Sequence, residues 1–149
     1  MPEILVLDAS VAAKWYLNDE DYVDLAEQLL IRLLNNNIEF HAPEILKYEL
    51  AEALYKAQRP SSQRFRRIDC EESYRHFCEL PIIYHNFNKR ERQHILEFSN
   101  RLDRHVFDSC YVWLARNLGC CWLTDDREYI KNLPPDFLNE RILLIENAK

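Results

Sequence analysis

The fold is decided by the stretch FDSCYVWLARNLGCCWLTDD, residues Phe107–Asp126, which contains a helical pattern, a lone glycine and a short apolar run. Apolar residues recur at helical spacing from Asp108 to Leu118. Gly119 is expected to end this helix, because glycine enters the left-handed cap conformation without steric cost. Residues 120–124 form a short apolar run that is typical of a buried strand. The stretch therefore predicts a helix followed at once by a strand.

Carboxylates stand near both ends of this stretch. A helix of about eleven residues spans roughly 16 Å, and five strand residues span about the same length. If the strand runs antiparallel to the helix, Asp108 and the pair Asp125–Asp126 return to one edge of the molecule. The stretch thus predicts that further acids converge at this edge, although chain geometry alone does not choose between Asp125 and Asp126.

Composition indicates one folded domain. The 149 residues are 48% apolar and 12% aromatic, which excludes a disordered chain. No apolar run reaches the roughly 18 residues of a membrane span, and the start MPEILVLDAS lacks a basic region typical of a signal peptide. We therefore expect a soluble, cytoplasmic protein. The net charge of −6 argues weakly against nonspecific nucleic-acid binding, because an acid cluster that binds cations contributes to it.

Cysteine usage argues against a disulfide framework or a zinc site. The count is odd and the chain has no C-x-x-C motif, so reduced, packed thiols are expected. The five cysteines are Cys70, Cys78, Cys110, Cys120 and Cys121.

Strand-like and helix-like segments alternate along the chain, which favours an α/β fold with a mainly parallel sheet. Strands are expected at Ile4–Leu7, Ile38–Ala42, Ile82–Phe87, Cys120–Thr124 and Ile142–Ile145. Helices are expected at Asp8–Leu17, Asp19–Asn36, Pro43–Gln58, Gln63–Leu80, Lys89–Leu102, Asp108–Leu118 and Arg127–Leu133.

Particular residues are expected to start or stop these helices. Asp19 and Asn88 are predicted N-caps, either Ser61 or Ser62 can cap the helix that follows, and Pro43 suits a first helical turn. In the segment after Ser61 and Ser62, the apolar residues at helical spacing include Phe65. Pro134–Pro135 is predicted to stop the helix that begins at Arg127. The single glycine excludes a glycine-rich phosphate loop.

Acids occur near several predicted strand ends and helix starts. Asp8 follows the first buried strand, where open α/β sheets place ligands, and Glu49 and Glu52 lie three residues apart on one helix face. Each acid alone could be a helix cap, a first-turn acid or part of a solvated face. Their conjunction favours a hard divalent cation, Mg²⁺ or Mn²⁺, which activates water for phosphoryl-ester hydrolysis.

Three stretches resemble the PIN domain family, most closely the VapC-type toxins of toxin–antitoxin pairs. They are LVLDASVAAKWYL, APEILKYELAEAL and VFDSCYVWLARNLGCCWLTDDREY, in family-like order and spacing. The resemblance implies one PIN-like nuclease domain over residues 1–149, with a three-layer α/β/α fold around a central, mainly parallel sheet. Residues 59–80 match no motif and are expected to form a variable helical segment.

The resemblance also implies a Mg²⁺- or Mn²⁺-dependent endoribonuclease, with one or two ions. Position by position, the four family acids are Asp8, Glu49, Asp108 and Asp126. Asp126 is chosen over Asp125 as the fourth acid only because it stands in the T-x-D position after Thr124. Ser10 matches a hydroxyl that could hold a metal-bound water. Glu52 and Asp125 are departures, because many relatives carry Asn and a small residue at these positions.

Further expectations concern what the protein binds. The family resemblance implies an RNA substrate, a small antitoxin that covers the site, and a homodimer. Arg101, Arg104 and Arg127 flank the third and fourth acids and are candidate phosphate contacts, although a solvated helix face would look the same in sequence.

Two alternatives remain open from the sequence. The chain could be a non-catalytic PIN-like module that acts through protein–protein contacts, although its complete set of acids argues against this. A phosphotransfer enzyme or receiver domain with Asp8 as acceptor fits poorly, because Ser10 stands where the related phosphatases need an acid.

Overall fold

A computed structural model describes residues 1–62, 64, 66–134 and 141–149. Its centre is a five-stranded sheet in the order β3-β2-β1-β4-β5, and each neighbouring pair is parallel. The strands are β1 (Glu3–Leu7), β2 (Ile38–Pro43), β3 (Ile83–His85), β4 (Cys121–Thr124) and β5 (Ile142–Leu144). The all-parallel pairing follows from the alternation of strands and helices along the chain.

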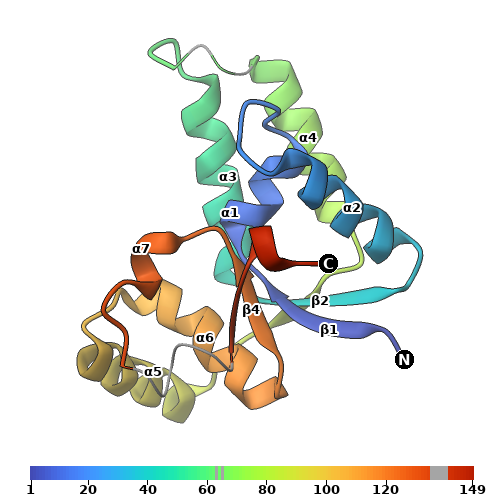
Figure 1. Ribbon diagram of the computed structural model, residues 1–149. Coiled ribbons are helices and arrows are strands. Elements are labelled where there is room, and N and C mark those ends of the chain that lie inside the picture. Colours follow the sequence, from blue (N-terminus) through green and yellow to red (C-terminus); the bar gives the residue numbers. More distant parts are fainter. Residues whose placement is uncertain (63, 65, 135–140) are drawn as a thin grey trace.

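Helices cover both faces of the sheet, so the predicted three-layer α/β/α architecture is confirmed (Figure 1). One group of helices comprises α1 (Ala9–Ala12), α2 (Val23–Leu34), α3 (Ile45–Gln58) and α4 (Arg67–Glu79). The other comprises α5 (Lys89–Leu102) and α6 (Val106–Leu118), with α7 (Arg127–Ile130) beside them. Short 3₁₀ turns, Ala13–Trp15 and Ile145–Asn147, complete the elements.

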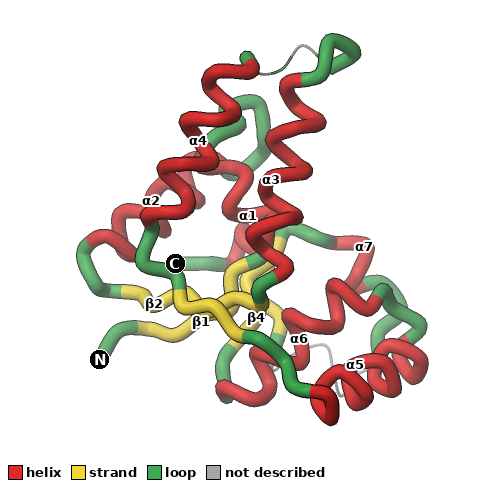
Figure 2. Tube along the Cα trace, turned by 180° about the vertical axis from the view of Figure 1, so that it is seen from behind, coloured by secondary structure: helices red, strands yellow, loops and turns green. Residues whose placement is uncertain are grey.

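The segment at residues 59–80 contains α4, which packs along α3 as a helical hairpin. In both views this hairpin rises away from the sheet (Figures 1 and 2). Tyr74 ties the two helices together, because its hydroxyl donates a 2.8 Å hydrogen bond to the backbone oxygen of Lys47. The expected start at Gln63, the apolar position Phe65 and the expected stop at Pro135 lie outside the described residues.

The predicted boundaries of α5 and α6 agree closely with the structure. Asn88 forms a capping box with Glu91: its side chain accepts from the Glu91 backbone, and the Glu91 side chain accepts from the Asn88 backbone. Gly119 ends α6 with φ at +69°, the left-handed cap that was expected. The helix begins two residues earlier than predicted, at Val106.

Replacing Gly119 by Ala is expected to lower the free energy of unfolding by about 1 kcal/mol. An added Cβ would meet no atom within 4 Å, so the cost comes only from the positive φ of the backbone. Thermal unfolding should shift down by roughly 2–4 °C, and Gly119→Asn should shift less because asparagine tolerates this conformation better. Equal destabilisation by both variants would contradict this explanation.

Three predicted helix starts are corrected. Asp19 does not cap α2: its carboxylate pairs with Arg64 at 2.6 Å, and the helix starts at Val23 after a left-handed Tyr22. Pro43 ends β2 instead of opening α3. Ser62 caps no following helix, because its hydroxyl donates back to the Ala57 carbonyl and α4 starts only at Arg67.

The core lies between the sheet and its two helical layers. Residues 5–7 of β1 are almost fully buried, as are Trp122 and Leu123 of β4. All five cysteines are free thiols, and Cys120 and Cys121 pack against this core. No helix in the described part of the chain is long and apolar enough to cross a membrane.

Candidate active site

The candidate site lies at the carboxyl ends of β1 and β4, the two central neighbours in the sheet. From β1 the chain continues to β2 on one side of it in the sheet, whereas from β4 it continues to β5 on the opposite side. Such a divergence opens a crevice at the strand ends of a parallel sheet. The register that pairs Leu7 with Leu123 places Asp8 beside Thr124.

Asp8 is the buried centre of the site, with 7% of its surface exposed. Its Oδ2 accepts hydrogen bonds from the Ser10 hydroxyl at 2.5 Å and from the Thr124 hydroxyl at 2.9 Å. These hydroxyls in turn accept from the backbone N–H groups of Asp125 and Asp126, each at 3.0 Å. Burial raises the pKa of Asp8, and these hydrogen bonds oppose the rise.

Glu49 approaches Asp8 from the first half of α3. The buried Tyr111 hydroxyl donates a 2.6 Å hydrogen bond to Glu49 Oε1. Burial raises the pKa of Glu49 to about 6, and the charges of Asp8 and Asp108 add to this effect. Because these charges influence one another, Glu49 belongs to the same cluster as the acids at the strand ends.

Asp108 and Asp126 line one cleft of about 540 Å³ beside the buried Asp8. Burial raises the pKa of Asp108 to about 6, with further contributions from Asp8 and Asp126. Asp126 Oδ1 accepts the backbone N–H of Tyr129 at 3.0 Å, which fixes its carboxylate at the start of α7. The structure thus brings together both ends of the opening stretch, as the matched lengths of helix and strand predicted.

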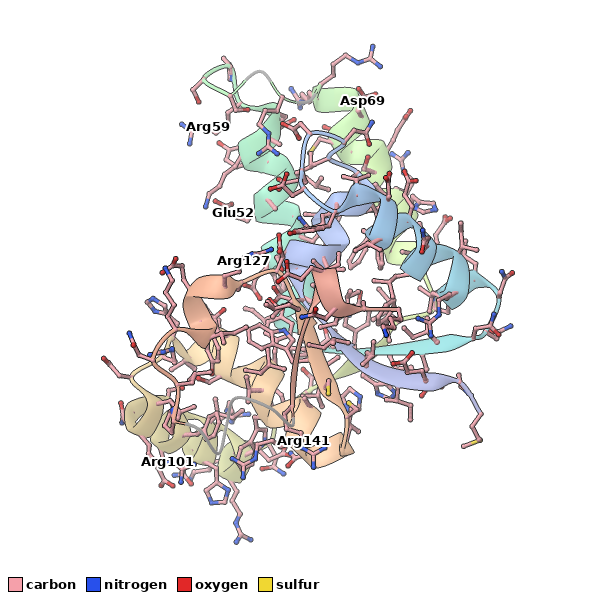
Figure 3. All side chains as sticks on the ribbon, in the orientation of Figure 1. Glu52, Arg59, Asp69, Arg101, Arg127 and Arg141 are labelled. Atoms are coloured by element: carbon pink, nitrogen blue, oxygen red, sulfur yellow. The ribbon has the colours of Figure 1, made fainter. Side chains whose placement is uncertain are left out.

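Asp125 and Glu52 have other partners. Asp125 Oδ2 lies 2.9 Å from the ammonium group of Lys14, a lysine that is only 1% exposed. Glu52 lies on the outer face of α3 (Figure 3) and forms an exposed 3.3 Å ion pair with Lys56. It shares a shallow groove with Glu49 and Phe107, next to the acids.

The three candidate arginines lie in different settings. Arg104 donates to the backbone carbonyls of Leu102, Asp103, Tyr129 and Lys131, and so ties the turn before α6 to α7. Arg127 pairs with Glu146 at 2.9 Å. Arg101 lies on α5, far from Arg127 in Figure 3, and lines a separate groove with Phe98 and Trp113. Only Arg104 lines the cleft of Asp108 and Asp126.

Sequence reasoning missed two residues that hold the acids in place. Tyr111 is fully buried in the core, and its hydrogen bond to Glu49 was not expected from the sequence. Its position three residues after Asp108, on the same helix face, was the available signal. Lys14 was not singled out at all, although a lysine within the apolar run VAAKWYL was a visible anomaly.

The acids form an all-oxygen donor set, which suits Mg²⁺ or Mn²⁺. Within the described residues, no three His, Cys, Asp or Glu side chains stand close enough together to hold an ion as they are. Burial, with a further contribution from neighbouring carboxylates, raises the pKa values of Glu49 and Asp108 to about 6, so keeping all these acids ionised calls for a positive charge among them. A divalent cation would supply this missing charge, so the residues present fit such an ion.

A family model for the PIN domain matches residues 5–133. The chain belongs to the PIN domain family. The motif resemblance seen in the sequence is thereby confirmed. No curated protein sequence matches this PIN domain.

Solved structures share the fold of this PIN domain. PAE2754 from Pyrobaculum aerophilum is 18% identical over 97% of this chain and 90% of its own, with a TM-score of 0.64. VapC20 from Mycobacterium tuberculosis, a sarcin–ricin loop cleaving toxin, is 10% identical over 87% and 96%, with a TM-score of 0.63. VapBC2 from Rickettsia felis, bound to a DNA fragment from their promoter, is 13% identical over 95% and 98%, with a TM-score of 0.60.

Proposed function

We propose that this PIN domain is a metal-dependent endoribonuclease and the toxin of a type II toxin–antitoxin pair. The observation that carries the proposal is the convergence of Asp8, Glu49, Asp108 and Asp126. Burial is the main cause of the raised pKa values of Asp8, Glu49 and Asp108, and the charges of other acids in this set add to each rise. The family membership and the fold shared with VapC20 and VapBC2 support it. The proposal includes an RNA substrate, a small antitoxin as partner and a second copy of the chain as a subunit.

The four acids would hold one or two Mg²⁺ or Mn²⁺ ions. A cation bound there supplies an activated water and neutralises charge on the phosphate group. Ser10 and Thr124 keep Asp8 in one orientation, Tyr111 does so for Glu49, and the backbone N–H of Tyr129 does so for Asp126. Fixed oxygens of this kind reduce the reorganisation that the site needs during reaction.

The reaction would be hydrolysis of an RNA phosphodiester. A water oxygen bonds to phosphorus, the bond to the leaving ribose oxygen breaks, and a proton from water ends on that oxygen. No side-chain nucleophile is required. The hydroxyl of Ser10 is already engaged, since it donates to Asp8 and accepts from the backbone of Asp125.

The direct test uses purified protein that has been shown to be free of any antitoxin. Structured and unstructured RNAs are incubated with the protein in Mg²⁺, Mn²⁺ or EDTA. Cleavage in both metals and its loss in EDTA are expected. If no RNA is cut in either metal, the nuclease proposal fails, and the alternative of a non-catalytic binding module is favoured.

Replacing Tyr111 by Phe tests the contact that orients Glu49. The variant keeps the buried ring but removes the 2.6 Å hydrogen bond to Glu49. Mn²⁺ affinity, measured by titration calorimetry, is expected to fall about 10-fold, which is typical for loss of a group that orients a ligand. Tyr74→Phe is the matched control, because its hydroxyl bonds the Lys47 carbonyl instead. Equal effects of both variants would show that Tyr111 has no specific role.

A further inference from the structure

Lys14 is the most deeply buried charged side chain near the site. It lies in the 3₁₀ turn after α1, is 1% exposed, and places its ammonium group 2.9 Å from Asp125 Oδ2. A second acid, Glu20, lies 4.0 Å from the same group. A buried ammonium group is stable only when it is paired, so Asp125 is its main counter-ion.

Residues 124–126 are held at several points around this ion pair. The Asp125 backbone N–H donates to Ser10, and the Asp126 backbone N–H donates to Thr124. Arg127 contributes little to holding Asp125, because its Nε lies 4.0 Å from Asp125 Oδ1 while its guanidinium group binds Glu146 at 2.9 Å. Lys14 is therefore the principal charged group that holds the Asp125 side chain.

Asp125 and Asp126 are adjacent in the chain, but their side chains have different partners: Lys14 for Asp125, and the Tyr129 backbone N–H for Asp126. Asp126 is the central residue of a tight turn at the end of β4, with φ −80° and ψ 88°, and the Arg127 backbone N–H donates a 3.1 Å hydrogen bond to the Asp125 carbonyl across it. Of these two neighbours, only Asp126 lines the cleft with Asp108. Lys14 therefore holds the Asp125 side chain in a place separate from that cleft.

We infer that Lys14 is a positioning residue that decides which acid of the Asp125–Asp126 pair faces the site. Lys14 neutralises Asp125 and holds it away from the other acids, so that Asp126 becomes the fourth oxygen donor. This inference rests on the proposed function for the identity of the ligand, a divalent cation. The pairing with Lys14 also explains how the chain can carry an acid at position 125 without adding a fifth negative charge to the four acids of the site.

The test compares Mn²⁺ binding by titration calorimetry in wild type, K14M, D125N, the double variant K14M/D125N and D126N. In K14M, Asp125 loses its counter-ion, and Mn²⁺ affinity is expected to fall by about 10-fold or more. In the double variant no charge is left unpaired, so affinity should return to within about threefold of wild type. D125N alone should also stay within about threefold, because Asp125 is not a donor.

Thermal unfolding is measured alongside. K14M is expected to unfold roughly 5–15 °C lower than wild type, since a buried charge loses its partner, and the double variant should recover much of this loss. Arg32→Met is the matched control: it removes a 2.6 Å pair with Glu3 at the other end of β1 and should leave Mn²⁺ affinity unchanged.

Two results would overturn the inference. One is a loss of Mn²⁺ affinity in D125N as large as that in Asp126→Asn, which would make Asp125 itself a donor. The other is unchanged Mn²⁺ affinity in folded K14M, which would leave Lys14 with a structural role only.

Failure of the proposed function looks different, because wild type itself would then bind no Mn²⁺ and cut no RNA. The crystal structure of K14M decides the inference in that case. We expect the Asp125 carboxylate to leave its wild-type place and the hydrogen bond from Tyr129 N to Asp126 Oδ1 to be lost. An Asp126 that keeps this bond, which is 3.0 Å in wild type, would overturn the inference.

Discussion

Replacing Asp8 by Asn is expected to lower the rate of RNA cleavage by more than about 100-fold. Loss of a residue that only orients a metal ligand costs about 10–100-fold, and Asp8 is proposed as a ligand itself. The amide keeps the size of the carboxylate, so Ser10 and Thr124 can still bond its oxygen. The variant should therefore stay folded, and the loss should be chemical.

The matched control for Asp8→Asn is Asp24→Asn, which removes the same charge from an exposed position in the first turn of α2. Cleavage rates are measured under single-turnover conditions with the same RNA and at saturating Mn²⁺. Asp24→Asn should cleave at the wild-type rate. Residual activity in Asp8→Asn close to that of wild type would mean that the cleavage comes from a contaminant or from another site.

Replacing Asp108 by Asn is expected to have opposite effects on stability with and without metal. Burial and nearby acids raise the pKa of Asp108 to about 6, so its ionised form destabilises the folded protein at pH 7. Because Asp108 is partly exposed, solvent screening reduces this cost to about 1 kcal/mol. Without metal, the variant should therefore unfold roughly 2–4 °C above wild type.

Saturating Mn²⁺ should reverse this order. A ligand at 100 times its dissociation constant stabilises the folded state by about 2.7 kcal/mol, which corresponds to roughly 5–11 °C for a chain of this size. Wild type should gain this amount, and Asp108→Asn should gain much less because it lacks a donor. A variant that is less stable than wild type in EDTA would contradict this account.

The pH dependence of the metal-free proteins provides an internal check. A carboxyl whose pKa is raised on folding binds more protons in the folded than in the unfolded state between about pH 4 and pH 6. Its contribution to stability is thus present at low pH and is lost as pH rises through about 6. The gap in unfolding temperature between Asp108→Asn and wild type should therefore widen from pH 5 to pH 7.

The main features of the fold could be predicted from the sequence because they depend on local signals. Gly119 marked the end of α6, and Asn88 marked the start of α5. Asp8 and Asp108 stood at a strand end and a helix start, and the alternation of elements brought these to one edge of the sheet. The matched lengths of the expected helix Asp108–Leu118 and the expected strand Cys120–Thr124 then predicted where the second acid of the opening stretch would return.

The supporting contacts could not be predicted, because they join segments that are distant in the chain. The pairing of Lys14 with Asp125 depends on how the turn after α1 packs beside the end of β4. Likewise, Asp19 looked like a helix cap because the sequence does not show that Arg64 folds back to bind it. The hydrogen bonds from Arg104 to the carbonyls of Tyr129 and Lys131 could not be predicted either, because the sequence does not show where α7 lies.

The central claim is that the acids at the ends of β1 and β4 bind a divalent cation. Crystals soaked in Mn²⁺, with diffraction recorded at a wavelength where manganese scatters anomalously, test it most directly. We predict an anomalous peak within coordination distance of Asp8, Asp108 and Asp126, with Asp125 still bound to Lys14. An absence of any peak at these acids, or a peak coordinated by Asp125 in place of Asp126, would contradict the account.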